Sequence, residues 1–322
     1  MSDPQRTYLD FERPIAELDN KIEELENLSN GESGVDVAAE ITTLRAKSSK
    51  LLSETYANLD PWRKTQVARH PNRPHFRDFR TACISDFAEL RGDRCFGDDR
   101  AIIGGTGVFR GRPVMILGHE KGHDTKSRLL HNFGMARPEG YRKAVRIMKM
   151  ADRFNLPVLS FVDTAGAYPG IGAEERGQAE AIARSTECCL TLGVPLVTLI
   201  IGEGGSGGAV ALAAASHLMM LEHSVYSVIS PEGCASILWS DAAKAKEAAT
   251  AMKVTATDLK ALKIIDEIIP EPIGGAHRDP VQVIQKAGDA IERALDLFTG
   301  LSGDEIRARR KARFYAIGRS GI

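Results

Sequence analysis

Val194-Pro-Leu-Val-Thr-Leu-Ile-Ile-Gly-Glu-Gly-Gly-Ser-Gly-Gly-Ala-Val-Ala-Leu-Ala-Ala-Ala215 is the stretch that decides the fold of this chain. Residues 196–201 are apolar except for Thr198 and rich in β-branched side chains, which predicts a strand buried on both faces of an α/β sheet. Residues 209–215 are small and helix-forming. Five glycines lie in the seven positions between them, at 202, 204, 205, 207 and 208.

The glycines of this strand-to-helix turn predict an anion-binding function. Each glycine loses more backbone entropy on folding than alanine would, so a series of five costs stability. A tight turn without a binding function would need only one or two glycines. What they provide is bare N–H groups at the start of a helix, where the backbone carries partial positive charge. Such a turn suits an anion or an oxyanion that develops during a reaction.

Three known glycine motifs compete for this turn. A P-loop needs Gly-Lys-Ser/Thr after its glycines, but Gly208 is followed by Ala209. A dinucleotide-binding loop needs an acid about twenty residues later in a first βα unit, and Glu222-His223 fits poorly. The pattern G-x-S-x-G at 204–208 is matched, so a serine hydrolase with Ser206 as nucleophile stays open. Its partners would come from Asp241, Asp258, Asp266, His217, His223 and His277.

Composition narrows the class of protein. The chain has 322 residues, a net charge of −1 and a pI near 6.7, so we expect neither nucleic acid nor membrane as a partner. The five cysteines, Cys83, Cys95, Cys188, Cys189 and Cys234, form no C-x-x-C pair. The start Met-Ser-Asp-Pro-Gln-Arg has no apolar core of a signal peptide. We therefore expect a cytoplasmic α/β protein with free thiols.

The pattern along the chain predicts four regions. Residues 1–59 form a helical hairpin broken at 30–34, and residues 60–86 a basic, proline-containing connector that is extended. Residues 87–299 form the α/β domain, and residues 300–322 a basic C-terminal helix and tail. Within the domain, 102–109 and 113–117 are predicted strands joined by a tight turn at 110–112.

A second glycine loop precedes the first. Residues 157–162 predict a buried strand that runs into Asp163-Thr-Ala-Gly-Ala-Tyr-Pro-Gly170, followed by a helix over 174–192. Two successive β–loop–α units place their loops at the same edge of a sheet, where ligands bind in open α/β sheets. The amides of Gly166, Ala167, Gly207 and Gly208 are then expected to converge as an oxyanion hole, with each donor worth about 3 kcal/mol in the transition state.

The segment His119-Glu120-Lys121-Gly122-His123 satisfies H-E-x-x-H, the pattern of zinc proteases. That motif works only on a helix, where positions i and i+4 share a face. Here it follows a predicted strand directly and contains Gly122. We therefore predict a polar loop and no metal site in this chain.

Several motifs together resemble one family. Asp163-Thr-Ala-Gly-Ala-Tyr-Pro-Gly170, Gly202-Glu-Gly-Gly-Ser-Gly-Gly208 and Tyr226-Ser-Val-Ile-Ser-Pro-Glu-Gly-Cys-Ala-Ser-Ile-Leu-Trp239 are similar to the carboxyltransferase alpha subunit of bacterial acetyl-CoA carboxylase. Asn132-Phe-Gly-Met135 and Pro138-Glu-Gly-Tyr-Arg-Lys143 match as well. The resemblance covers nearly the whole chain. The family usually has Gln and Arg where this sequence has Glu120 and His123.

The resemblance implies a crotonase-like (ClpP/crotonase) ββα superhelix and the transfer of a carboxyl group from carboxybiotin to acetyl-CoA, which gives malonyl-CoA for fatty acid synthesis. It implies an α2β2 assembly with a zinc-containing beta subunit, working with a biotin carboxyl carrier protein and biotin carboxylase. The biotin ureido oxygen would sit at Gly207 and Gly208, helped by Gly166 and Ala167. Gly204, Gly205 and Ser206 would line the substrate site.

Overall fold

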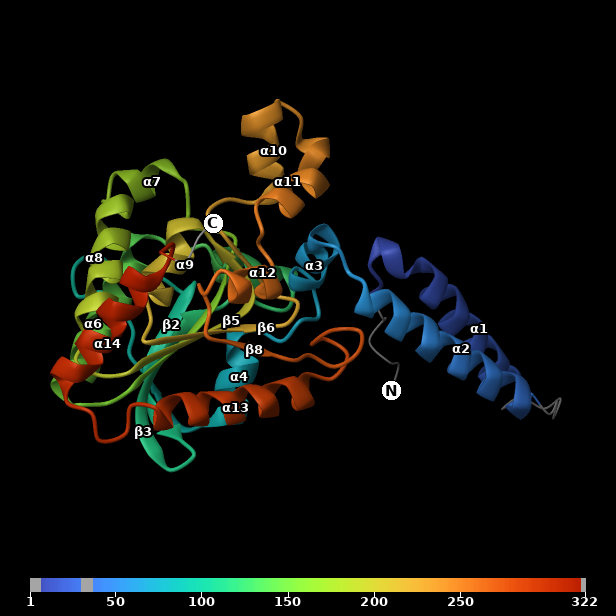
Figure 1. Ribbon diagram of the computed structural model, residues 1–322, viewed down its shortest axis with the longest axis horizontal. Coiled ribbons are helices and arrows are strands. Elements are labelled where there is room, and N and C mark those ends of the chain that lie inside the picture. Colours follow the sequence, from blue (N-terminus) through green and yellow to red (C-terminus); the bar gives the residue numbers. More distant parts are fainter. Residues whose placement is uncertain (1–6, 30–36, 320–322) are drawn as a thin grey trace.

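One mixed sheet forms the centre of the computed structural model, which describes residues 7–29 and 37–319. Within these residues the sheet has eight strands (Figure 1). Their bounds are β1 (Ile84–Glu89), β2 (Ile102–Phe109), β3 (Arg112–His119), β4 (Val158–Thr164), β5 (Leu196–Gly205), β6 (His217–Leu221), β7 (Val225–Ser227) and β8 (Glu267–Ile269).

The strand order is β1-β2-β3-β4-β5-β6-β8, and β7 pairs with the far end of β5. The strands from β3 to β8 pair in parallel, whereas β1, β2 and β3 are antiparallel. Arg110 and Gly111 form the two-residue turn between β2 and β3, with φ of 46° and 81°. Positive φ at both positions is what a type I′ hairpin requires, so the predicted tight turn is confirmed.

Helices cover both faces of the sheet. Val158 and Val162 of β4 face a core built with α6, α8 and α9, whereas Leu159 and Phe161 face a second core built with α4 and α13. Every residue of β4 and β5 is buried, as predicted for strands covered on both sides. The helices concerned are α4 (Phe76–Cys83), α6 (Pro138–Arg153), α8 (Gln178–Thr191), α9 (Ser206–Ala213) and α13 (Pro280–Asp296).

The remaining helices lie around this centre (Figure 1). Their bounds are α3 (Pro61–Ala68), α5 (Thr125–Leu130), α7 (Ile171–Glu174), α10 (Pro231–Trp239), α11 (Ala245–Ala251), α12 (Ala256–Ala261) and α14 (Gly303–Ala316). In the part of the chain that is described, no helix is both long and apolar enough to cross a membrane.

The N-terminal helices α1 (Arg13–Ser29) and α2 (Ala38–Ala57) pack on each other and project from the sheet domain, which confirms the predicted hairpin (Figure 1). The predicted break at 30–34 lies outside the described residues. The hairpin is fixed to the domain near its base. Glu12 accepts a hydrogen bond from Tyr56, at 3.0 Å, and forms an ion pair with Arg278, at 3.1 Å.

Three details differ from the expectations. Residues 60–86 are not extended: α3 and α4 lie there, and Phe76 and Phe79 are buried in the core because they share one face of α4. The helix predicted over 174–192 is interrupted at Gly177, whose φ is 78°. The strand predicted to end at Ile201 continues to Gly205, because β7 pairs with its glycines.

Candidate oxyanion site at the carboxyl edge of the sheet

The two glycine-bearing segments meet at one edge of the sheet, as predicted. Thr164 of β4 pairs with Gly204 of β5. A Cβ added to Gly205 would lie 2.2 Å from the carbonyl oxygen of Ala165, and one added to Gly208 would lie 2.7 Å from the amide nitrogen of Ala167. Side chains at these two positions would therefore push the segments apart, which gives a physical reason for glycine.

Free amides gather where the segments touch. Gly207 and Gly208 lie in the first turn of α9, where N–H groups have no intrahelical partner. Among the described residues the Ala167 amide also donates no hydrogen bond within the chain. Because the start of a helix carries partial positive charge, free amides at this junction would favour a negatively charged oxygen.

Gly166 differs from its predicted role. Its amide donates to Oγ1 of Thr164 at 3.1 Å, and the same hydroxyl donates to the Gly166 carbonyl at 2.8 Å. The amide is therefore already engaged and is not one of the free donors. With φ of 150° and almost complete burial, Gly166 instead lets the chain turn close to Ser206.

The residues predicted to line the substrate site lie in different elements of secondary structure. Gly204 and Gly205 belong to β5 and pair with Tyr226 and Ser227 of β7, so their main chain holds the sheet together. Ser206 is exposed at the junction of β5 and α9, with φ of 57°. Positive φ is uncommon for a serine, and it turns the chain sharply from strand into helix.

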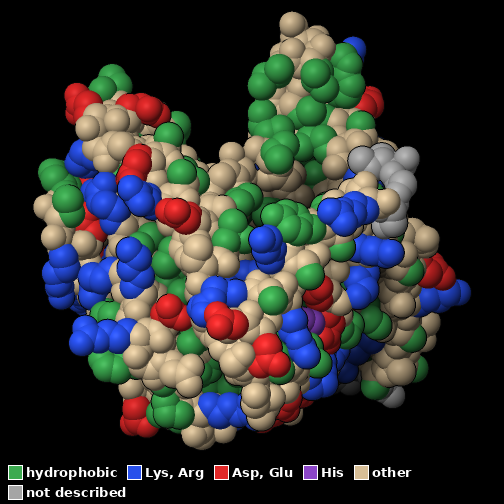
Figure 2. Space-filling model, turned by 60° about the vertical axis from the view of Figure 1, so that its left-hand side comes forward, with side chains coloured by type: hydrophobic (Ala, Val, Ile, Leu, Met, Phe, Trp, Pro, Cys, Tyr) green, Lys and Arg blue, Asp and Glu red, His purple; other side chains and the backbone are tan. Residues whose placement is uncertain are grey.

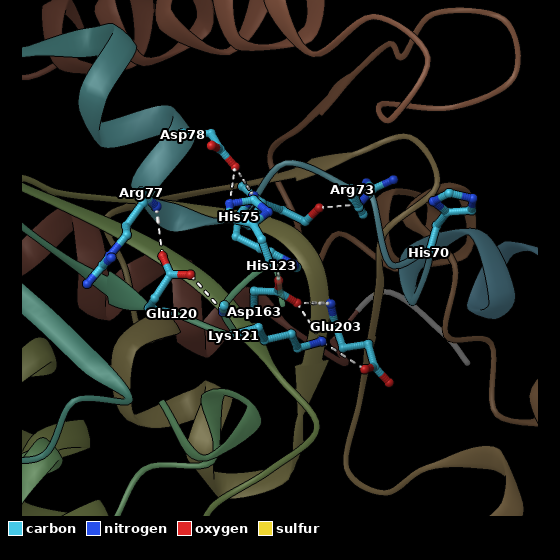
Figure 3. Close-up of polar contacts among 12 residues, drawn as sticks. His70, Arg73, His75, Arg77, Asp78, Glu120, Lys121, His123, Asp163 and Glu203 are labelled. Carbon is cyan, nitrogen blue, oxygen red and sulfur yellow. Dashed lines mark hydrogen bonds and ion pairs between the residues drawn. The ribbon is translucent and has the colours of Figure 1, made fainter. Parts of the chain in front are cut away.

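A buried carboxylate braces the two segments (Figure 3). Asp163, the residue before Thr164, accepts from the amide of Glu203 at 3.0 Å and from Nδ1 of His75 at 3.0 Å. Nζ of Lys121 lies 2.8 Å from Asp163 and 3.0 Å from Glu203. One ammonium group thus links Asp163, the first residue of one glycine segment, to Glu203 in the other.

Neighbouring charges keep the side chains of Asp163 and Lys121 ionised. Burial opposes the charge on Asp163, but Lys121 and His75 outweigh it and hold the pKa of the carboxyl group well below its usual range. Burial likewise opposes the charge on Lys121, but Asp163 and Glu203 raise the pKa of the ammonium group above its usual value. Neither residue was predicted from the sequence, although the position of Asp163 at the carboxyl end of a buried strand was a signal for it.

The network continues to a helix beyond the sheet. Arg69, at the end of α3, lies 2.6 Å from Glu203 and 2.5 Å from Glu232 in the first turn of α10. A pocket of about 220 Å³ adjoins this network. It is lined by Ala68, Arg69, His70, Pro71, His75, Lys121, Arg128, Phe133, Ala165 and Glu203.

The H-E-x-x-H segment lies at a strand end and in the following loop, not on a helix. His119 is buried at the end of β3, whereas His123 lies in the following loop, 3.3 Å from Asp78. Glu120 is buried too and accepts from the amides of Arg77 and Gly122, at 2.9 and 2.8 Å. Since a strand end and a loop carry the two histidines, they do not share the helix face that the motif needs.

Ser206 lacks the partners of a hydrolytic nucleophile. Among the described residues, no hydrogen bond joins its hydroxyl to a histidine. The three downstream histidines have other neighbours: His217 lies 4.0 Å from Glu267, the amide of His223 donates to Glu271, and His277 stacks on His70. The sharp turn that resembles a nucleophile elbow is thus present without its acid–base pair.

Solved structures with the same architecture define the class. A transcarboxylase 12S structure, described as a hexamer with methylmalonyl-coenzyme A and methylmalonic acid bound, aligns with a TM-score of 0.58 at 18% identity. The alignment covers 70% of this chain and 42% of that one. A Pseudomonas malonate decarboxylase hetero-tetramer in complex with coenzyme A aligns with a TM-score of 0.56 at 18% identity. This alignment covers 69% of this chain and 90% of that one. The fold is crotonase-like, as predicted.

Sequence similarity then identifies the family. Residues 8–318 match the family described as acetyl co-enzyme A carboxylase carboxyltransferase-like. The acetyl-coenzyme A carboxylase carboxyl transferase subunit alpha of Caulobacter vibrioides is 64% identical over 98% of both chains, and that of Xanthobacter autotrophicus is 62% identical over 98% of this chain and 99% of its own. The chain belongs to this family. The serine hydrolase alternative finds no support in these matches.

Proposed function

We propose that this chain is the alpha subunit of an acetyl-CoA carboxyltransferase, which moves a carboxyl group from carboxybiotin to acetyl-CoA and forms malonyl-CoA. The family membership supports the reaction. Carboxybiotin, carried on a separate protein, supplies the activated carboxyl group. This product is the building block of fatty acid synthesis, so we place the protein at its first committed step.

The convergence of free amides supports a role for this chain in the chemistry. Ala167, Gly207 and Gly208 would donate to the ureido oxygen of biotin, which gains negative charge as the carboxyl group leaves. The absence of a side chain at Gly208 lets the start of α9 lie close to the Ala167 amide nitrogen. Backbone amides do not titrate, so this stabilisation persists over the whole working pH range.

The beta subunit would complete the site. We propose an α2β2 assembly in which beta supplies a matching hole for the acetyl-CoA enolate, with the carrier protein and biotin carboxylase delivering the carboxyl group. Hydrophobic side chains gather on the projection formed by α10 and α11 (Figure 2). Ile237, Leu238 and Trp239 of α10 are 73%, 65% and 41% exposed. An apolar surface of this kind supports a protein partner there, and we place the assembly in the cytoplasm.

The test is reconstitution with a beta subunit of the same family. Malonyl-CoA-dependent carboxylation of biocytin should appear when both chains are mixed and should be at background with either chain alone. Ser206→Ala should retain the activity, because the hydroxyl has no role in the proposed chemistry. Full activity of the beta chain alone would contradict the proposal. Labelling of Ser206 by a fluorophosphonate would support the serine hydrolase alternative.

A further inference from the structure

The start of α6 is tied to the loop that carries Ala167. The amide of Tyr168 donates to the Ala136 carbonyl at 2.9 Å. Nε2 of Gln178 donates to the carbonyls of Ala136 and Tyr168, each at 2.9 Å. The first turn of α6 therefore has a fixed place relative to the oxyanion site, and Tyr141 lies in that part of the helix.

Tyr141 extends to the back of the oxyanion site. Its side chain is 0% exposed. A Cβ added to Gly208 would lie 2.8 Å from the Tyr141 hydroxyl and 2.7 Å from the Ala167 amide nitrogen. The hydroxyl thus lies next to Gly208, at the point where the two segments touch.

The Tyr141 hydroxyl has no hydrogen-bond partner among the described residues. Burying a hydroxyl without a partner costs stability, and in native proteins most such groups are paired. Phenylalanine would fill the same space without that cost. A tyrosine is therefore unfavourable for folding at this position unless the hydroxyl has another role.

We propose that Tyr141 is a positioning residue of the oxyanion site. Its hydroxyl supplies a dipole beside Gly208 and Ala167, close to their free amides. Because the hydroxyl is not held by a partner, its hydrogen can turn toward the negative charge that develops in the transition state. In a buried, low-dielectric setting such a dipole strengthens the field of the amides without touching the substrate.

The test is Tyr141→Phe in the reconstituted complex, and it depends on the proposed carboxyl transfer. Removing a direct oxyanion donor lowers kcat by roughly 100-fold, so loss of a dipole one layer further back should lower it by about tenfold. KM should stay unchanged, because the dipole acts on charge present only in the transition state. The midpoint of thermal unfolding should stay the same or rise, since an unpaired buried hydroxyl is removed.

Tyr56→Phe is the matched control. Tyr56 is also buried, but its hydroxyl donates to Glu12 at the base of the hairpin, at 3.0 Å. This variant should unfold at a lower temperature and keep the wild-type kcat. The two phenylalanine variants are thus expected to change stability and turnover in opposite ways.

The outcomes distinguish a failure of the proposed function from a failure of the role proposed for Tyr141. An inactive wild-type complex would contradict the proposed function. An active wild-type complex with unchanged kcat in Tyr141→Phe would overturn the role of Tyr141, as would a variant that loses stability and has the wild-type kcat. Incorporation of 3-fluorotyrosine at position 141 keeps the hydroxyl, so its kcat should stay within about twofold of wild type. A tenfold loss there would also overturn the inference.

Discussion

Oδ1 of Asp163, at the end of β4, accepts a hydrogen bond from the main-chain amide of Glu203 in β5, with 3.0 Å between the two atoms. This contact joins the two glycine-bearing segments, 163–170 and 202–208. The relative position of the Ala167 amide and the amides of α9 therefore depends on one buried carboxylate. Lys121 keeps that carboxylate charged from 2.8 Å away.

Lys121→Met should strongly destabilise the chain. It leaves Asp163 and Glu203 buried without their shared cation, and breaking a buried ion pair by removing one partner costs about 3–5 kcal/mol. Urea denaturation measures the loss. Lys50→Met is the control, because Lys50 pairs with Glu54 on the surface and should have little effect. Equal stability of the two variants would show that the Lys121 pair does not brace the site.

Adjacent glycines should respond differently to alanine. A Cβ at Gly208 would lie 2.7 Å from the Ala167 amide nitrogen, whereas one at Gly207 would contact only Ile182, at 3.4 Å. Gly208→Ala should therefore displace the donors and lower kcat by roughly 100-fold, and Gly207→Ala should be far milder. Biocytin carboxylation by the reconstituted complex gives both values. A Gly208→Ala variant as active as Gly207→Ala would contradict the proposed hole.

His119 should make the fold sensitive to acid. Burial lowers the pKa of its imidazole from 6.5 to about 4. Between these pH values the unfolded chain therefore binds a proton that the folded chain does not bind. The contribution to stability is fully present above pH 6.5 and is lost as pH falls toward 4, by about 3 kcal/mol in total. Urea unfolding between pH 4 and 7 should show a steeper acid loss for wild type than for His119→Leu.

His123 provides a contrast of opposite sign. A hydrogen bond to Asp78 raises the pKa of its imidazole, so its contribution is present at acid pH and is lost as pH rises through that value. His123→Gln should therefore lower stability at pH 5 more than at pH 8. If the stability of the His119 and His123 variants changed with pH in the same way, neither pKa assignment would hold.

The exposed apolar side chains of α10 should matter for assembly. Leu238→Asp should weaken binding of the beta subunit by at least about tenfold, because central apolar residues dominate the affinity of protein interfaces. The unfolding midpoint of the isolated chain should not change. Val281→Asp on α13 is the matched control, since Val281 is 76% exposed and lies elsewhere on the molecule. Titration by calorimetry compares the two variants, and equal affinities would remove α10 from the interface.

Local chemistry explains why much of the fold could be predicted. The apolar run at 196–201 has a side-chain pattern that only a strand covered on both faces satisfies, and Ser206 follows a glycine series that forces a sharp turn into α9. The hairpin of α1 and α2 followed from spacing of apolar residues by three and four. Residues 60–86 were predicted wrongly as extended. Pro61 is the first residue of α3, and proline is compatible with that position of a helix.

By itself, the sequence determined the family, the two glycine-bearing units and the sheet edge on which they meet, because these depend on periodicity and on residues a few positions apart. Only the tertiary structure showed how closely the two segments approach. A Cβ on Gly208 would lie 2.7 Å from the Ala167 amide nitrogen, although 41 residues separate them in the chain. It also brought Lys121 between Asp163 and Glu203, since the geometry of side chains from separate strands is fixed only when the core packs around them.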